Sequence, residues 1–195
     1  PHSTLPGRSV GEAFRTGVFW RLLVAFFLIS VVVGGFIVNL PAMLADRGTS
    51  PAQAAQALGL MGIAIIVGRL TVGALVDRFA VRVIAPLYIL LPAASCLLLA
   101  GGDAAPVAII LVGLAAGAEV DLLAYLTGHL FGMRHYARIY GWGLAAFSAG
   151  AGVGPGFAGW VHDVSGSYVD ALYAFAAMIA VASALLATLR PPEAC

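Results

Sequence analysis

The sequence has 195 residues, of which 62% are hydrophobic and only 10% are charged, and its mean hydropathy is +1.01. A soluble domain needs far more charge to cover its surface, so the composition excludes an ordinary soluble enzyme domain. The net charge of +1 argues against nucleic acid as a partner. The two cysteines, Cys96 and Cys195, have neither metal-ligand nor plausible disulfide spacing. We therefore expect no metal, no cofactor and a chain that resides in a lipid bilayer.

Six long apolar segments follow one another, each close to the roughly 20 residues that a helix needs to cross the hydrocarbon. The segments are continuous rather than alternating, which favours helices over a β-barrel. We predict an all-α membrane protein whose transmembrane bundle fills residues 17–190. Its six spans are expected at about 17–44, 53–76, 82–101, 104–131, 137–162 and 167–189.

The segments outside the bundle are a lead-in over residues 1–16 and a tail over 191–195. In the lead-in, Ser9 and Glu12 have the spacing of a capping box, which predicts a short interfacial helix before the first span. After the first span, Gly48 can end a helix and Ser50-Pro51 can begin the next. The chain starts with Pro1 rather than Met, so we expect it to be a piece of a longer protein.

The arginines indicate an orientation, because basic residues near helix ends are retained on the cytoplasmic side. In a six-span arrangement only Arg47 falls on the outer side, and Arg69 lies within a span. The others all fall on the opposite side: Arg8, Arg15, Arg21, Arg78, Arg82, Arg134, Arg138 and Arg190. The outer loops carry aspartates instead: Asp46, Asp103, Asp163 and Asp170. We predict a multi-pass protein of the cell (inner) membrane with both termini in the cytoplasm.

An internal repeat relates the two halves of the chain. A shift of 86 residues lays the first three spans over the last three. Under this shift Val67, Gly68, Gly73 and Asp77 fall on Val153, Gly154, Gly159 and Asp163. Because three is an odd number of crossings, the second copy must be upside down. Inverted repeats are a common construction of secondary transporters, so we predict a 3+3 inverted repeat.

Two segments carry a family resemblance. The loop after the second span reads Gly73-Ala-Leu-Val-Asp77-Arg78 and is followed by Arg82, and a second pattern runs over 117–132 and 134–141. Together they resemble the major facilitator superfamily, specifically the C-terminal six-helix half of its monocarboxylate and oxalate/formate branch. The resemblance covers nearly all of residues 10–190. It implies half of a twelve-helix fold, whose partner is a missing N-terminal six-helix half or a second copy.

Arg69 is the most informative candidate for a functional residue, because a charge at the bilayer centre costs about 2.5–3.5 kcal/mol on insertion scales. It lies about two helical turns inside the membrane from Asp77. A guanidinium can hold a carboxylate with two hydrogen bonds, so we interpret Arg69 as the binding group for a substrate anion. The resemblance supports this, since organic-anion members carry an Arg at the matching position. Snorkelling to the cytoplasmic interface is the alternative.

Glu119 and Asp121 lie near the middle of the fourth span and point in nearly opposite directions. The face of Asp121 includes Gly117 and Tyr125, which makes Asp121 the better cavity residue, for coupling or for balancing Arg69. Glu119 shares its face with apolar residues and is expected to be buried against a neighbouring helix. A purely structural bond between helices is the alternative for each acid. Asn39 and Tyr125 are further candidates for hydrogen bonds to a substrate.

The loop residues Gly73, Asp77, Arg78 and Arg82 form the expected gating cluster. In the family, this cluster holds helices together in one access state and is released in the other. An exposed ion pair contributes only about 0–1 kcal/mol, which suits a latch that must open. A surface turn that anchors orientation is the alternative. We also expect Gly73 to allow a close helix approach or a tight path near the loop.

A run of small residues in the fifth span contains Gly154, Pro155 and Gly159. Pro155 removes a backbone hydrogen bond and the glycines allow bending. This pattern predicts a hinge for alternating access, with tight packing as the alternative.

The leading hypothesis is secondary active transport of a small organic anion, a carboxylate, by alternating access, as an antiporter or a symporter. A truncated or non-transporting membrane module is the second hypothesis. An intramembrane enzyme is disfavoured, because the chain has no His-Glu-x-x-His motif and no Ser-His arrangement at bilayer depth.

Overall fold

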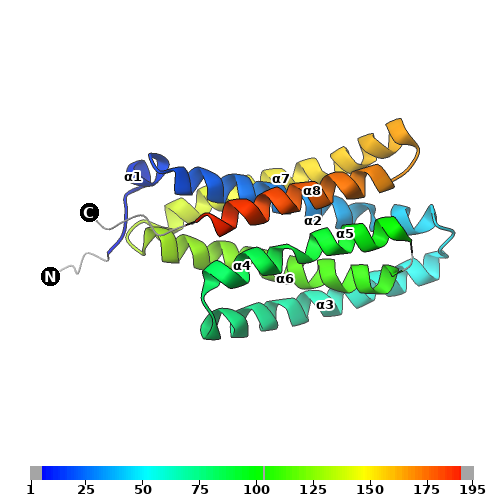
Figure 1. The fold of residues 1–195 in the computed structure, drawn as a ribbon, viewed down its shortest axis with the longest axis horizontal. Coiled ribbons are helices and arrows are strands. Elements are labelled where there is room, and N and C mark those ends of the chain that lie inside the picture. The colour runs from blue at the N-terminus through cyan, green and yellow to red at the C-terminus, as the bar shows by residue number, and fades with distance from the viewer. Residues whose placement is uncertain (1–5, 103, 190–195) are drawn as a thin grey trace.

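The computed structural model describes residues 6–102 and 104–189, with Arg82 described by its backbone alone. The described chain is all-helical, as predicted, and its long helices lie side by side along one axis (Figure 1). Its helices are α1 (Val10–Phe14), α2 (Gly17–Ala45), α3 (Pro51–Arg78), α4 (Val81–Ile89), α5 (Leu91–Gly101), α6 (Ala105–Phe131), α7 (Tyr136–Ser165) and α8 (Val169–Ala187). The short helix α1 and the last turn of α8 lie at the same end of the bundle (Figure 1).

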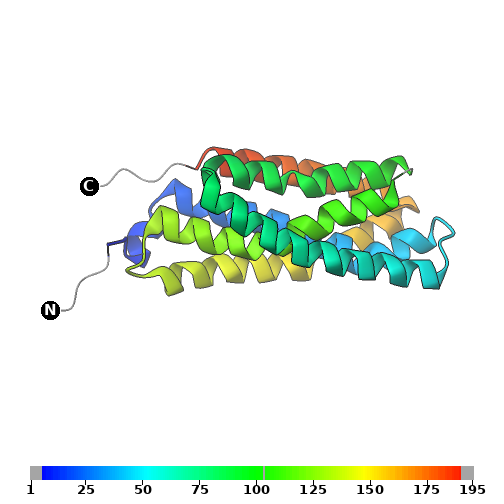
Figure 2. The ribbon, with the colours of Figure 1, turned by 90° about the horizontal axis from the view of Figure 1, so that it is seen from below.

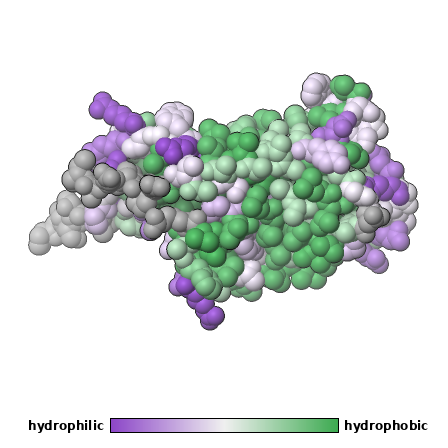
Figure 3. Space-filling model, viewed as in Figure 1, coloured by the Kyte–Doolittle hydropathy of each residue, from purple (hydrophilic) through white to green (hydrophobic). Residues whose placement is uncertain are grey.

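The helices have the length and composition of membrane spans. Among the described residues, five segments are long and apolar enough to cross a bilayer: Gly17–Ala45, Pro51–Arg78, Val83–Gly101, Ala105–Phe131 and Val169–Ala187. Helix α7 is also long enough, with 30 residues, but glycines in its middle lower its hydropathy. The surface is hydrophobic along the middle of the bundle and hydrophilic towards both ends (Figure 3). This is the surface of a multi-pass membrane protein.

Local sequence signals explain where several helices begin and break. The predicted capping box is formed, with the Ser9 amide donating to Glu12 Oε2 at 2.6 Å. Ser50 caps α3 in the same way. The third apolar segment differs from the single helix expected over 82–101, because it is divided at Leu90 into α4 and α5. Pro92 has no N–H with which to continue the helical hydrogen bonds at this point.

Helices α2 and α6 form the centre of the bundle, and each buries side chains along most of its length. Helices α4, α5 and α8 pack together on one side of them (Figure 2). Helix α3 packs along α6, and α7 packs along α2. Both α3 and α7 bury only a few, mostly small residues and leave large apolar side chains exposed. These two helices are therefore the least covered elements of the chain.

The packing follows the internal repeat. A shift of 86 residues lays α2 over α6, α3 over α7 and the α4–α5 segment over α8. The α2–α7 pair then becomes the α6–α3 pair, and the α5–α6 pair becomes the α8–α2 pair. Matched glycines behave alike: a Cβ on Gly68 or Gly154 would collide with a backbone carbonyl of the neighbouring helix, whereas one on Gly73 or Gly159 would meet open space. The fold is the predicted six-helix half with its 3+3 inverted repeat.

Candidate functional site

Small residues bring α3 and α6 close together in the middle of the bundle. A Cβ on Gly68 of α3 would collide with the backbone of Leu114, and one on Gly117 of α6 would collide with the carbonyl of Ile65. The same hypothetical Cβ on Gly117 would lie 2.9 Å from the backbone nitrogen of Arg69. Close contact at these positions therefore carries the side chain of Arg69 to the adjacent turn of α6.

Arg69 and Asp121 form an ion pair across this contact. The distance from Arg69 Nε to Asp121 Oδ2 is 3.2 Å, and the side chains are 61% and 46% exposed in the isolated chain. A guanidinium carries five donors in a planar fork. Asp121 therefore balances the charge of Arg69, and the exposed guanidinium remains accessible to a second anion.

Two hollows meet at Asp121. One, of about 110 Å³ between α3 and α6, is lined by Val72, Gly73, Val76, Asp77, Asp121, Leu122 and Tyr125. The other, of about 570 Å³, is lined by Asp121, Ala124, Tyr125, Gly128, His129, Met133 and Tyr136. Asp121, Tyr125 and His129 follow one another at intervals of four residues, so they share one face of α6. The rings of Tyr125 and His129 stack with their centroids 6.2 Å apart.

The other acid of α6 points away from this groove. Glu119 is 7% exposed, and its Oε2 atom is buried without a hydrogen-bond partner among the described residues. The predicted contrast between an accessible Asp121 and a buried Glu119 is confirmed. The coupling roles of both acids stay predictions.

The expected gating cluster is placed at the end of α3 nearest α1. Asp77 lines the smaller hollow and forms no ion pair with another described side chain. Arg78 is exposed in the last turn of α3, and Arg82 lies in the first turn of α4 with its side chain outside the described atoms. Of the two alternatives for Gly73, the close helix approach is not made among the described residues, because a Cβ there has nothing within 4 Å. A tight path near the loop stays a prediction. The close contact lies five residues earlier, at Gly68.

The expected hinge residues lie in an unbroken helix. Helix α7 continues through Pro155, and Gly154 is tightly packed against Val31 of α2. Gly159 faces open space. The Pro155 carbonyl accepts a hydrogen bond of 3.3 Å from Asn39 Nδ2. Asn39 is thus engaged between α2 and α7, and its described partners do not include any residue of the groove at Asp121.

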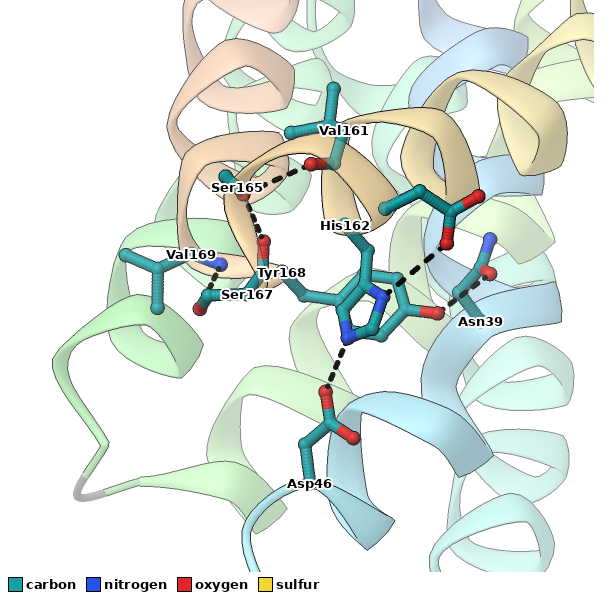
Figure 4. Close-up of polar contacts among 9 residues, drawn as sticks. Asn39, Asp46, Val161, His162, Ser165, Ser167, Tyr168 and Val169 are labelled. Carbon is teal, nitrogen blue, oxygen red and sulfur yellow. Dashed lines mark hydrogen bonds and ion pairs between the residues drawn. The ribbon is translucent and has the colours of Figure 1, made fainter.

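A further polar cluster, which the sequence did not suggest, lies at the end of the bundle opposite α1 (Figure 4). His162 of α7 lies between Asp46 and Asp163, and Tyr168 lies beside it. Asp46, His162 and Tyr168 line a hollow of about 560 Å³ where α2, α5, α7 and α8 meet. Asp46 and His162 are 116 residues apart, so only the packing of α2 on α7 reveals their contact.

The chain was compared with known proteins. A family model described as the Major Facilitator Superfamily matches residues 22–194. A benzoate transport protein of Acinetobacter baylyi is 27% identical over 154 residues, which are 77% of this chain and 32% of that protein. This chain therefore spans about a third of the length of that curated relative.

Solved structures with a similar fold include two of the fucose:proton symporter FucP, one being an E. coli variant and the other described as the outward conformation. Each superposes with a TM-score of 0.76 and 20% sequence identity, over 91% of this chain and 44% of the symporter. The likeness at this identity shows the fold. The family match over residues 22–194, together with a half-bundle of apolar helices, shows that the chain belongs to the Major Facilitator Superfamily of membrane transporters.

Proposed function

We propose that this chain is half of a secondary transporter that moves a small organic anion, a carboxylate, by alternating access. The observation that carries the proposal is the Arg69–Asp121 ion pair, 3.2 Å long, which is set in apolar helices and accessible from a groove. A charged residue within the membrane is expensive and is a functional candidate by default. The solute's carboxylate binds the guanidinium of Arg69.

In this proposal the Asp121 carboxylate pairs with Arg69 whenever no solute carboxylate is bound. In the empty site it occupies the Nε edge of Arg69, which lowers the cost of keeping the cation within the membrane. A guanidinium can hold a carboxylate with two parallel hydrogen bonds. An arriving carboxylate competes with Asp121 for Arg69, so the solute can both bind and leave.

The groove also suits an apolar or aromatic body attached to the carboxylate. The Tyr125 and His129 rings stack along the same face of α6, and Met133 and Tyr136 complete the larger hollow. The relative named for benzoate transport supports this choice, because benzoate is an aromatic carboxylate. The symporter structures support the fold alone, since their sequence identity is 20%.

A second bundle completes the transporter in this proposal. This chain spans 32% of the benzoate transport protein and 44% of the fucose symporter. Its two least covered helices present exposed apolar side chains: Ile63, Ile66, Val67 and Leu70 on α3, and Trp142, Leu144, Val153 and Trp160 on α7. A six-helix N-terminal half, or a second copy, covers these faces and closes the groove at Asp121.

The proposed location is the cell (inner) membrane, with the α1 end of the bundle in the cytoplasm. The arginines support this orientation, since they belong to the lead-in, the start of α2, the α6–α7 connection and the first turn of α7: Arg8, Arg15, Arg21, Arg134 and Arg138. These segments all lie at the α1 end. The positive-inside rule assigns that end to the cytoplasm.

The test is uptake of radiolabelled benzoate and other small carboxylates by proteoliposomes that contain the complete protein. Arg69→Ala should lower uptake about tenfold to hundredfold, because a hydrogen bond to a charged group contributes about 1.5–3 kcal/mol. Arg69→Lys should recover only part of it, since an ammonium lacks the planar fork. Arg15→Ala removes an exposed arginine outside the bundle and serves as the control. Undiminished uptake of every organic anion by Arg69→Ala would refute the substrate role.

A further inference from the structure

The outer ends of α2 and α7, those opposite α1, are joined by a polar network centred on His162 (Figure 4). His162 Nε2 lies 3.0 Å from Asp46 Oδ2, where Asp46 is the residue that ends α2. On the other side of the ring, His162 Nδ1 lies 3.8 Å from Asp163 Oδ1. Both ring nitrogens therefore face carboxylates.

The network continues from His162 towards the middle of α7. The Tyr168 ring stacks on the imidazole with centroids 4.3 Å apart, and its hydroxyl donates to Asn39 Oδ1 at 3.4 Å. The Asn39 amide donates to the carbonyls of Gly35 at 2.9 Å and Pro155 at 3.3 Å. A continuous chain of contacts thus runs from the end of α2 to the proline of α7.

This chain of contacts spans the part of α7 that is least restrained by its own backbone. Pro155 has no N–H to donate to the carbonyl one turn earlier, so a helical hydrogen bond is missing there. Gly156 and Gly159, which follow it, have no atom within 4 Å of a hypothetical Cβ. Polar bonds to Asn39 and His162 therefore add to the close packing of α7 on α2 in fixing the outer segment of α7.

The two carboxylates beside His162 can both receive a hydrogen bond only from a ring that carries two N–H groups. A neutral imidazole has one N–H and donates to one carboxylate only, whereas an imidazolium attracts both Asp46 and Asp163. Arg47 is a further charged residue that lines the same hollow as His162, and its guanidinium donates to the Leu99 carbonyl. Burial and the charges of Asp46 and Asp163 raise the pKa of Tyr168, so its hydroxyl keeps its proton and continues to donate to Asn39.

We propose that His162 and Asn39 are positioning residues that hold the outer segment of α7 against α2, and that a proton on His162 tightens this contact. Histidine side chains gain a proton as pH falls through about 6.5. The contact is complete when both ring nitrogens of His162 carry a proton, and it is weaker for the neutral ring, which donates to one carboxylate only. The inference rests on the proposed alternating access but does not depend on which solute is carried.

The test measures the distance between spin labels on α2 and α7 in the complete protein, reconstituted in lipid nanodiscs. Labels replace Val38 and Val164, which are 61% and 72% exposed. Cys195→Ser removes one competing thiol, and Cys96 is fully buried and so is protected from the label. In the wild-type background the distance distribution should be narrow at pH 5 and broader, with a longer mean, at pH 8. His162→Gln should show the broad distribution at both values, because glutamine carries no proton-dependent charge.

Three further variants make the result decisive. Asp46→Asn should also lose the pH response while leaving His162 in place, and it covers the case in which His162→Gln does not fold. Asn39→Ala should broaden the distribution at both pH values. His135→Gln, at the other end of α7, is the matched control and should respond as wild type.

A wild-type distribution that does not change with pH, or a response that survives in both His162→Gln and Asp46→Asn, would overturn the proposal. Arg69→Ala should retain the response, so this result and that of the uptake experiment can fail independently.

Discussion

At the scale of single residues, the important distinction is between the two acids of α6. They are two positions apart, so the helix directs Asp121 to the groove and Glu119 into the packed interior. This division follows from helix geometry and could be predicted from the sequence, as could the possibility that Arg69 meets one of the acids at the same depth. The choice of Asp121 depends on which face of α6 receives α3.

Asp121→Asn is expected to change how transport depends on pH. Asp121 lines both hollows and can exchange a proton with the groove, whereas an amide cannot. The measurement is the rate of carboxylate uptake against external pH, with Glu12→Gln, an exposed change in α1, as the control. An unchanged profile would remove Asp121 from the coupling path. A profile changed by Glu119→Gln and not by Asp121→Asn would assign coupling to the buried acid instead.

The contacts that could not be predicted from the sequence share one property. The role of Asn39 at the substrate stays a prediction, but its bonds to Pro155 and Tyr168 join residues more than 100 positions apart along the chain. The contact between His162 and Asp46 could not be predicted for the same reason, since they are 116 positions apart. A contact between side chains on different helices can be predicted only when the rotation and the axial register of both helices are known. The local periodicity of the sequence gives neither.

At the scale of helices, close contacts are made by a few glycines that the internal repeat relates. Gly68 and Gly154 are packed against the backbones of α6 and α2, whereas Gly73 and Gly159 face open space. The sequence pattern showed that these glycines correspond but not which pair makes the contact. The sequence pattern therefore did not distinguish Gly68, where α3 closely approaches α6, from Gly73, where it does not.

Gly68→Ala should destabilise the protein by about 1–3 kcal/mol, because the added methyl group would force α3 away from the Leu114 backbone. Gly154→Ala should have a similar effect at the α7–α2 contact. The measurement is the midpoint of thermal unfolding of the complete protein in detergent. The matched controls are Gly73→Ala and Gly159→Ala, which add the same group where nothing lies within 4 Å. Equal midpoints for Gly68→Ala and Gly73→Ala would contradict the packing described here.

At the scale of the whole molecule, composition, span length and the 86-residue shift were sufficient to predict an all-α membrane protein built from two inverted three-helix units. These features depend on averages over many residues and tolerate local errors, such as the break at Leu90 between α4 and α5. The apolar side chains exposed on α3 and α7, by contrast, are explained only by the second bundle of the proposed function, which would cover them. The functional tests proposed here therefore use the complete protein.

Direct binding of radiolabelled benzoate to the purified complete protein tests the central claim, that a carboxylate replaces Asp121 at Arg69. We predict that Arg69→Ala weakens binding about tenfold or more, while Asp121→Asn binds at least as tightly as wild type, because the competing carboxylate is gone. Wild-type affinity in Arg69→Ala, across benzoate and a panel of other small carboxylates, would contradict the account.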